Sequence, residues 1–443
     1  MAMIVKNNMS AVNTLNILNK NQSSLAKSLQ KVSSGMKIND AGDDASGYAI
    51  SERMRVQIRS LNQDNQNTQN GNSMMKTAEG AVSSTVEILK TLKEKAINAA
   101  NDTNTDEDRR TIQKEINQMV DQIDDNALAT YNGKYLVDGS RNSIGKATCT
   151  TLTNSSLSTE SKWASALTEL QSRTNEGLNI QSTDKITVSY VREGKTYTTT
   201  FQVSTYTMAD LLTKKAFNGT DGVDGSDFVD KAKTQEGSFI GLDKAGNSVY
   251  TADNKNAMSL NAKGAGTTFQ VSSFTLSISD NTGAIRKTAN TALDGFNERI
   301  RAENASADNA LTLQTGTKAN QAIKVSMTDM RSLALGMKGT DGSVISVQTQ
   351  DKANAAINSI ETALQKALDE QANIGAVQTR LSYTSSNLTT AAENVQNSES
   401  TIRDADMAKE MTEYTKNNVL LQAAQSMLAQ ANQNSSAVLS LLK

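Results

Sequence analysis

VQTRLSYTSSNLTTAAENVQNSESTIRDA, residues 377–405, decides the fold of this chain. Its apolar and small residues recur at alternating spacings of four and three, which is the a/d pattern of a coiled coil. The positions are Val377, Leu381, Thr384, Leu388, Ala391, Val395, Ser398, Ile402 and Ala405. A helix with this pattern needs a partner helix to cover its apolar seam.

The N-terminus repeats the same pattern. Its positions are Ala11, Leu15, Leu18, Gln22, Leu25, Leu29, Val32 and Met36. At 1.5 Å per residue this seam extends for about 39 Å, which is long enough to lie along the C-terminal helix in a parallel or an antiparallel pair. Each end has a single stripe and little else to cover it, so we expect both ends to be disordered in a free monomer and ordered in an assembly.

Residues 417–442 carry no charge, and their apolar residues cover more than one face of a helix. A membrane anchor is one interpretation, since the length of the run permits a span. Six amide side chains oppose it, because each would cost several kcal/mol in hydrocarbon unless it were paired. They are Gln422, Gln425, Gln430, Asn432, Gln433 and Asn434. We therefore expect no membrane insertion and a helix covered by protein, including other subunits.

Composition excludes most chemistry. The 443 residues have a net charge of -2 with scattered basic residues, which disfavours nucleic-acid binding. With no His and only Cys149, histidine catalysis, a disulfide and the usual zinc sites are absent. Asp43 and Asp44 are better placed to cap a helix than to form a site. We predict no enzyme activity and no catalytic, cofactor-binding or metal-ligating residue. The absence of Pro suits long, straight helices.

The acids Asp121, Asp124 and Asp125 fit a solvated helix face better than a calcium site, because no EF-hand spacing follows them. Around them the spacing predicts further helices. One begins near Ala45 and continues toward residue 75, a three-four stripe then covers 75–99, and another stripe covers 112–123. Thr105 and Asp108 resemble a capping box before this last helix.

Between about residues 140 and 304 the composition becomes rich in Thr, Ser, Gly and Asp, and short runs alternate between apolar and polar residues. This pattern predicts a β-rich insert. Residues 186–203 indicate a hairpin around Glu193-Gly194. A further strand pair is expected around residues 267–278, with a bulge where the alternation slips by one between Val271 and Phe274. Residues 159–171 and 207–217 indicate short helices. Further on, 311–327 indicates another hairpin and 346–368 a helix. The predicted fold is mainly α, with paired coiled-coil ends, a helical bundle with a hairpin inside them, and an outer α+β insert.

Three segments then resemble bacterial flagellins. The run LQKVSSGMKINDAGDDASGYAISERMRVQIRSLNQ, residues 29–63, is similar to their N-terminal signature. IRDADMAKEM at 402–411 and LLQAAQSMLAQANQ at 420–433 are similar to their C-terminal signature. The resemblance covers about residues 1–140 and 305–443, in the same order as in that family.

The resemblance implies a subunit that assembles head-to-tail with itself into the flagellar filament. It implies an inner tube from residues 1–42 and 404–443, an outer tube from 43–140 and 305–403, and a surface-exposed insert at 141–304. It also implies secretion by the flagellar type III route and partners that include an export chaperone, the cap and hook-junction proteins. The polymerisation residues expected on the seams are Leu15, Leu18, Leu25, Leu29, Val32, Leu388, Val395, Ile402, Leu420, Leu421, Met427 and Leu428.

The family segment recognised by a vertebrate innate immune receptor usually carries an Arg and a Leu where this chain has Thr91 and Lys95, whereas Glu115 matches. We therefore predict weak receptor signalling. Two alternative functions stay open at this point. One is a hook-filament junction protein, and the other is a secreted translocator or adhesin.

Overall fold

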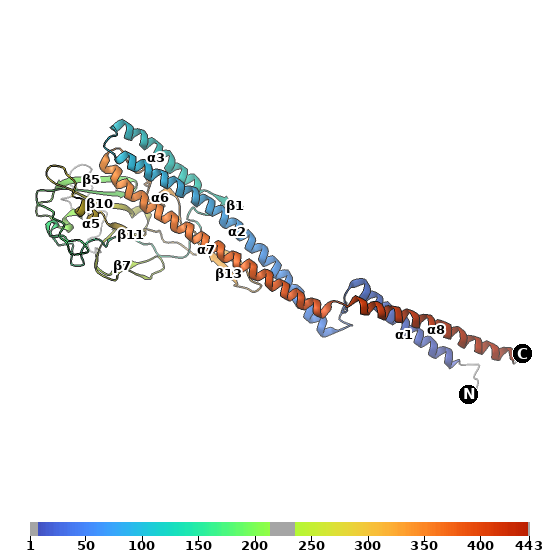
Figure 1. Cartoon of the computed structure of the whole chain (residues 1–443). Coiled ribbons are helices and arrows are strands. Elements are labelled where there is room, and N and C mark those ends of the chain that lie inside the picture. The colour runs from blue at the N-terminus through green and yellow to red at the C-terminus, as the bar shows by residue number, and fades with distance from the viewer. Residues whose placement is uncertain (1–7, 213–234, 442–443) are drawn as a thin grey trace. The chain divides into compact units, whose positions relative to one another are not determined.

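The computed structural model describes residues 8–212 and 235–441 and divides into two compact units. The terminal unit comprises residues 1–68, 314–321 and 383–443, and the central unit comprises 69–313 and 322–382. Two long helices, α2 (Ala45–Ala100) and α7 (Gln350–Arg403), each contribute to both units. Figure 1 labels the elements along the chain.

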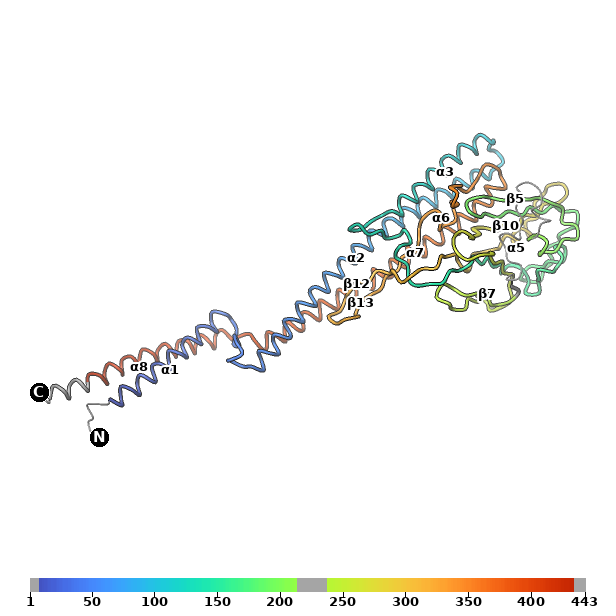
Figure 2. Tube along the Cα trace, turned by 180° about the vertical axis from the view of Figure 1, so that it is seen from behind, coloured from blue at the N-terminus to red at the C-terminus, as the bar shows by residue number. Residues whose placement is uncertain are grey.

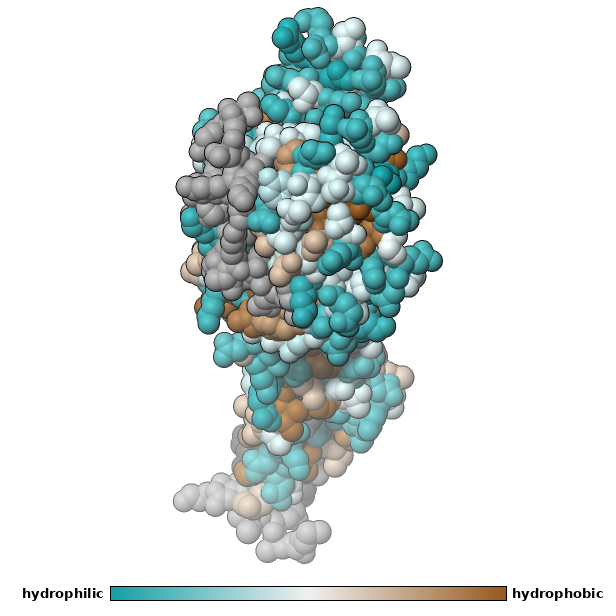
Figure 3. All heavy atoms as spheres, turned by 90° about the vertical axis from the view of Figure 1, so that its left-hand side faces the viewer, coloured by the Kyte–Doolittle hydropathy of each residue, from teal (hydrophilic) through white to brown (hydrophobic). Residues whose placement is uncertain are grey.

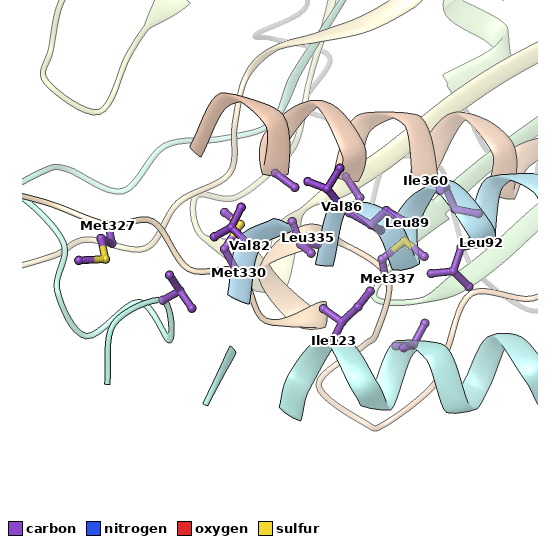
Figure 4. Close-up of a cluster of buried hydrophobic side chains, with 14 of the residues drawn as sticks. Val82, Val86, Leu89, Leu92, Ile123, Met327, Met330, Leu335, Met337 and Ile360 are labelled. Atoms are coloured by element: carbon purple, nitrogen blue, oxygen red, sulfur yellow. The ribbon is translucent and has the colours of Figure 1, made fainter. Parts of the chain in front are cut away.

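The helical part of the central unit is built from α2, α7, α3 (Asp106–Ala127) and the short α6 (Ser332–Leu335). The predicted stripe on α2 is its core face, where Leu89 and Leu92 are fully buried. Labelled side chains of α2, α3, α6 and α7 gather around Met337 in Figure 4, while Met327 lies apart from them. One apolar core therefore packs α2, α3 and α7 against the segment that contains α6.

Local signals in the helices are confirmed, with one difference. The capping box is present, because the Thr105 N–H donates to Asp108 at 2.9 Å and the Asp108 N–H donates to the Thr105 hydroxyl at 3.3 Å. The stripes at 45–75 and 75–99 lie on a single helix of 56 residues. The Asn70-Gly71 pair lies between the two stripes without ending the helix. Gly71 packs closely there, since a Cβ at this position would lie 2.7 Å from the Leu313 side chain.

Two small hairpins belong to this part of the fold. Asn132-Gly133 joins β1 (Thr130–Tyr131) to β2 (Lys134–Tyr135), as an Asn-Gly turn predicts. The hairpin expected at 311–327 is also present, as β12 (Leu311–Gln314) paired with β13 (Ala322–Val325). The helix expected from residue 346 begins at Gln350 instead.

The insert is β-rich, as predicted, and has its own core around Trp163, Tyr190 and Phe274. Its sheets have strand orders β10-β4-β5, β11-β3-β9-β6 and β7-β8. The strands are β3 (Thr151–Asn154), β4 (Lys185–Arg192), β5 (Lys195–Gln202), β6 (Gln235–Gly237), β7 (Phe239–Leu242), β8 (Ser248–Tyr250), β9 (Ala257–Asn261), β10 (Val271–Ser279) and β11 (Phe296–Ile300), and α5 (Lys287–Leu293) packs on β10. Hydrophilic residues dominate the insert face shown in Figure 3.

The predicted β4–β5 hairpin and the bulge in β10 are confirmed, the latter as a register shift between Val271 and Ser273. The strand pair expected at 267–278 was wrong, because Thr267–Phe269 form a 3-10 turn and the rest belongs to the single strand β10, which pairs with β4. The predicted lengths of the two short helices, at residues 159–171 and 207–217, were wrong. Residues 159–171 contain only a 3-10 turn at Leu167–Glu169, and the described part of 207–217 contains only Met208–Leu212, while 213–217 lies outside the described residues. Backbone groups there are engaged elsewhere, since the Leu167 N–H donates to the Tyr206 carbonyl at 3.1 Å.

Several polar contacts fasten the insert to the rest of the central unit, and two of them show the range. At the β4–β5 turn, the Ser343 hydroxyl donates to the Glu193 carbonyl at 2.7 Å. On α7, Lys366 forms a buried ion pair with Glu298 of β11 at 3.2 Å, with both side chains at most 6% exposed. The Lys366–Glu298 pair is thus shielded from water, whereas the Ser343–Glu193 hydrogen bond is only partly buried.

The terminal unit contains α1 (Met9–Ser34) and α8 (Met407–Leu441), which lie side by side in Figures 1 and 2. It also contains the first part of α2 and the last part of α7. The two connectors, residues 35–44 and 404–406, lie between these helices.

Candidate assembly surface

The first feature of this surface is the antiparallel α1·α8 pair. Near the start of α1, the Asn8 side chain donates to the Ala431 carbonyl at 3.1 Å. Near its end, the Asn417 side chain donates to the Ser28 hydroxyl at 3.0 Å. Early residues of α1 therefore meet late residues of α8, which resolves the choice between parallel and antiparallel that the sequence left open.

The seam of α1 is divided between two surroundings. Ser28 is buried at the contact with α8, and Leu18, Leu25 and Val32 are half-buried. Leu15 and Leu29 are 44% and 51% exposed. Only part of the predicted seam therefore faces α8, and the rest is open to solvent in the single chain.

The seam of α8 is divided in the same way. Ala424 is buried against α1, and Leu421 and Leu428 are half-buried. Leu420 and Met427 are 43% and 62% exposed. Large apolar side chains are thus exposed on both helices, which is unfavourable in water. The α1·α8 pair therefore has an apolar surface that the single chain does not cover.

The third predicted seam lies on α7, where it packs in the terminal unit. Leu388 is buried, and Val395 and Ile402 are half-buried. Next to them, Ser385 on α7 donates to Asn65 on α2 at 2.6 Å. These three residues are thus covered more fully within the chain than the exposed residues of α1 and α8.

The seam ends earlier than its spacing suggests. α7 ends at Arg403, so Ala405 lies outside the helix, and α8 begins at Met407. The Asp406 carboxylate accepts from the Ala408 N–H at 3.0 Å, which caps the new helix. The spacing alone cannot show this break, because the three-four pattern passes through it.

Arg403 is a junction residue that the sequence patterns did not identify. It is 5% exposed, its guanidinium donates to Glu52 at 2.7 Å, and it lies 5.4 Å from the centre of the Tyr48 ring. The Glu52 pKa is held below its usual value, chiefly by this hydrogen bond. The carbonyl of Arg403 also accepts from the Lys37 N–H at 2.8 Å. One side chain and its backbone therefore join the connector 35–44, α2 and α7.

The receptor-equivalent positions lie on α2 and α3 of the central unit. Thr91 is half-buried, and the Lys95 ammonium forms an ion pair with the Glu115 carboxylate at 2.5 Å. The structure thus brings the differing residue and the matching residue together. The Glu115 carboxylate is therefore paired with the Lys95 ammonium within the same chain.

The described residues provide neither a metal-binding cluster nor a membrane-spanning helix. Within residues 8–212 and 235–441, no three His, Cys, Asp or Glu side chains gather closely enough to hold a metal ion. Across those same ranges, no helix is both long and apolar enough to span a membrane. Cys149 is a half-buried free thiol.

Exposed apolar residues along both helices of a pair are typical of a protein that covers them with other protein molecules, as a structural subunit of an assembly does. Comparisons with known proteins identify which one. The profile of the bacterial flagellin N-terminal helical region matches residues 5–142, and that of the C-terminal helical region matches residues 357–442. The chain is 34% identical over 440 residues to a flagellin of Clostridium tyrobutyricum, covering 97% of this chain and 99% of that one. It belongs to the flagellin family.

A flagellin of Bacillus subtilis is 30% identical over 461 residues, with full coverage of both chains. Among solved structures, flagellar hook associated protein-3 from Legionella pneumophila aligns with 78% of this chain and 97% of its own, at a TM-score of 0.33 and 14% identity. The chain is a structural subunit of the bacterial flagellar filament. Neither the junction-protein nor the translocator or adhesin alternative is favoured.

Proposed function

We propose that the α1·α8 pair supplies the polymerisation surface of the filament. The exposure of Leu15, Leu29, Leu420 and Met427 is the observation that supports this proposal. Their burial by neighbouring copies would remove apolar surface from water at about 25 cal/mol per Å². The half-buried residues beside them would be covered further in the same step.

In this proposal residues 1–42 and 404–443 form the inner tube, and 43–140 with 305–403 form the outer tube. The insert, 141–304, lies on the outer surface, and its hydrophilic face in Figure 3 suits contact with water. The chain is structural and carries out no enzymatic reaction. These assignments depend on family membership and on the distribution of apolar surface.

Secretion belongs to the same proposal. The family implies an extracellular filament, and we propose that this chain reaches it unfolded through the flagellar type III route. An export chaperone would cover the apolar surface of α8 before secretion, and the cap and junction proteins would contact the growing and the basal filament ends. A chain without Pro and with one Cys has no prolyl isomerisation or disulfide exchange to complete after export.

We further propose that the vertebrate innate receptor recognises this chain weakly. The family segment carries an Arg and a Leu at the positions of Thr91 and Lys95. In this chain Lys95 instead neutralises Glu115 in an ion pair. A receptor would have to break that pair before using the Glu115 carboxylate.

Deletion of residues 421–443 tests the central proposal. The deleted protein should retain the thermal unfolding transition of the central unit but form no filaments after seeding, as seen by electron microscopy. A matched control changes Leu242, which is 55% exposed on the insert and lies outside the terminal helices, to Ala in the full-length protein and should still polymerise. Filaments formed by the deletion protein would refute the proposed role of α8.

A further inference from the structure

The exposed leucines of α1 form a line along the helix. Leu15, Gln22 and Leu29 are seven residues apart and all are exposed. A spacing of seven returns to nearly the same side of a helix, so these residues form one continuous strip. None of the three carries a charge. We call the strip of Leu15, Gln22 and Leu29 the first edge.

A second strip lies on α8. Leu420 and Met427 are also seven residues apart and exposed, and the sequence around them is uncharged from Asn417 onward. Covering this strip requires no desolvation of an ion within it. We call Leu420 and Met427 the second edge.

The two edges lie on opposite sides of the helical pair. On α1, Leu29 follows the buried Ser28 by one residue. Its side chain is therefore rotated about 100° from that of Ser28 around the helix axis, in the direction in which residue numbers increase. On α8, Leu420 and Met427 turn about 40–60° the other way from the buried Ala424. Because the helices are antiparallel, these opposite turns become the same rotation when the pair is viewed from one end. The buried faces of α1 and α8 point toward each other. The same direction of rotation away from each buried face therefore places the first edge and the second edge on opposite sides of the pair.

Opposite edges decide how copies can associate. A two-fold contact would bring like edges together and close after two copies, whereas a filament needs a contact that does not close. Copies placed side by side in the same orientation bring the first edge of one against the second edge of the next. We propose that the first edge of each copy packs on the second edge of its neighbour in the filament.

This inference rests on the proposed polymerisation surface and adds the identity of the two complementary strips. The partner is a second copy of the same chain. Each copy then uses both edges at once, so each is covered on both sides of its α1·α8 pair. A copy at the end of such a row retains one uncovered edge, to which the next can add.

Cysteine crosslinking tests this pairing directly. Replacing the single native cysteine, Cys149→Ser, gives a background without thiols. On it, Leu15→Cys and Leu29→Cys mark the first edge, while Leu420→Cys and Met427→Cys mark the second. Filaments are assembled from one first-edge and one second-edge variant, treated with a flexible bis-maleimide, and examined by denaturing electrophoresis.

The expected result is a covalent dimer in at least one of the four mixed pairings and none in filaments of any single variant. Dimers within single-variant filaments, or no dimer in any mixed pairing, would overturn the inference. A variant that does not polymerise alone is added as a minority component to filaments of the Cys149→Ser chain. Failure of the Cys149→Ser chain itself to form filaments would contradict the proposed function instead, so the two failures are distinguishable.

A chain carrying both Leu29→Cys and Leu420→Cys provides a further control in the dilute, unassembled protein. Opposite edges predict no crosslink within one chain with a short bis-maleimide. An efficient intramolecular crosslink would place both strips on the same side and exclude the proposed packing.

Discussion

The β4–β5 turn offers a direct test of how the insert is fastened to the helical bundle. Gly194 has a φ of +70°, and a Cβ added there would lie 2.2 Å from the backbone oxygen of Ser343. Gly133 has a nearly identical φ of +72° but has no neighbouring atom within 4 Å of the same position. Gly133→Ala is therefore a matched control, because it shares the backbone strain and lacks the close approach.

Both substitutions should cost about 1–2 kcal/mol for placing a side chain in the left-handed region. Gly194→Ala should cost about 1–3 kcal/mol more, because a backbone oxygen cannot move aside as a flexible side chain can. Withdrawal of the turn would also break the hydrogen bond from Ser343 to Glu193, worth about 1 kcal/mol. The expected difference between the variants in the free energy of unfolding is about 2–4 kcal/mol.

The assay is thermal unfolding followed by the fluorescence of Trp163, the single tryptophan, which is buried in the insert core. At about 2 °C per kcal/mol for a unit of this size, Gly194→Ala should melt about 4–8 °C below Gly133→Ala. Hydrogen exchange at residues 339–343 should also rise in Gly194→Ala alone. Equal melting temperatures for the two variants would show that the turn does not hold the insert in place.

Three further predictions concern the core, the buried charges and the receptor segment. Leu89→Ala, at a fully buried position of α2, should lower the free energy of unfolding by about 2–5 kcal/mol in denaturant titrations. Ile97→Ala, at a position that is 53% exposed on the same helix, should change it by about 0.5 kcal/mol or less. Similar losses of stability in the two variants would contradict the assigned core. Burial raises the pKa of Glu370 despite a hydrogen bond from Thr328, so its carboxyl favours folding when protonated and loses that contribution as the pH rises through its folded pKa. Glu370→Gln, which mimics the protonated form, should therefore gain stability relative to the parent as the pH rises from 4 to 8 in melting experiments, and an unchanged difference across that range would refute the charge assignment. Thr91→Arg combined with Lys95→Leu should increase receptor activation in a cell reporter assay, with Lys90→Leu on the same helix as the control, and no increase would count against the proposed basis of weak recognition.

Spacing in the sequence predicted the helices well because their partners have the same periodicity. The α1 and α8 seams, the α2 stripe and the Thr105 capping box depend on residues within one or two turns of each other, so the sequence contains the whole signal. The β4–β5 hairpin was predictable for the same reason. The expected disorder of both ends in a free monomer stays a prediction, as do the polymerisation residues.

Features formed by distant segments could not be read from spacing. The break at residues 404–406 depends on Arg403 being held by Glu52 and by the connector near Lys37, neither of which lies nearby in sequence. The sequence contains only a weak signal for the burial of Lys366 and Glu370. The two residues are four positions apart, so they share a face of α7, and they lie next to the core residues Ala363 and Ala367. The division of each seam into covered and exposed positions appears only when the antiparallel register is known.

The connector 404–406 also limits how the chain can be re-engineered. Its ends are tied on both sides, because the Lys37 N–H donates to the Arg403 carbonyl and the Ala405 N–H donates to the Gly35 carbonyl. Inserting one residue there would rotate α8 by about 100° about its axis while α7 stayed fixed. Even a single-codon insertion between α7 and α8 should therefore abolish motility, because it would turn α8 relative to α1.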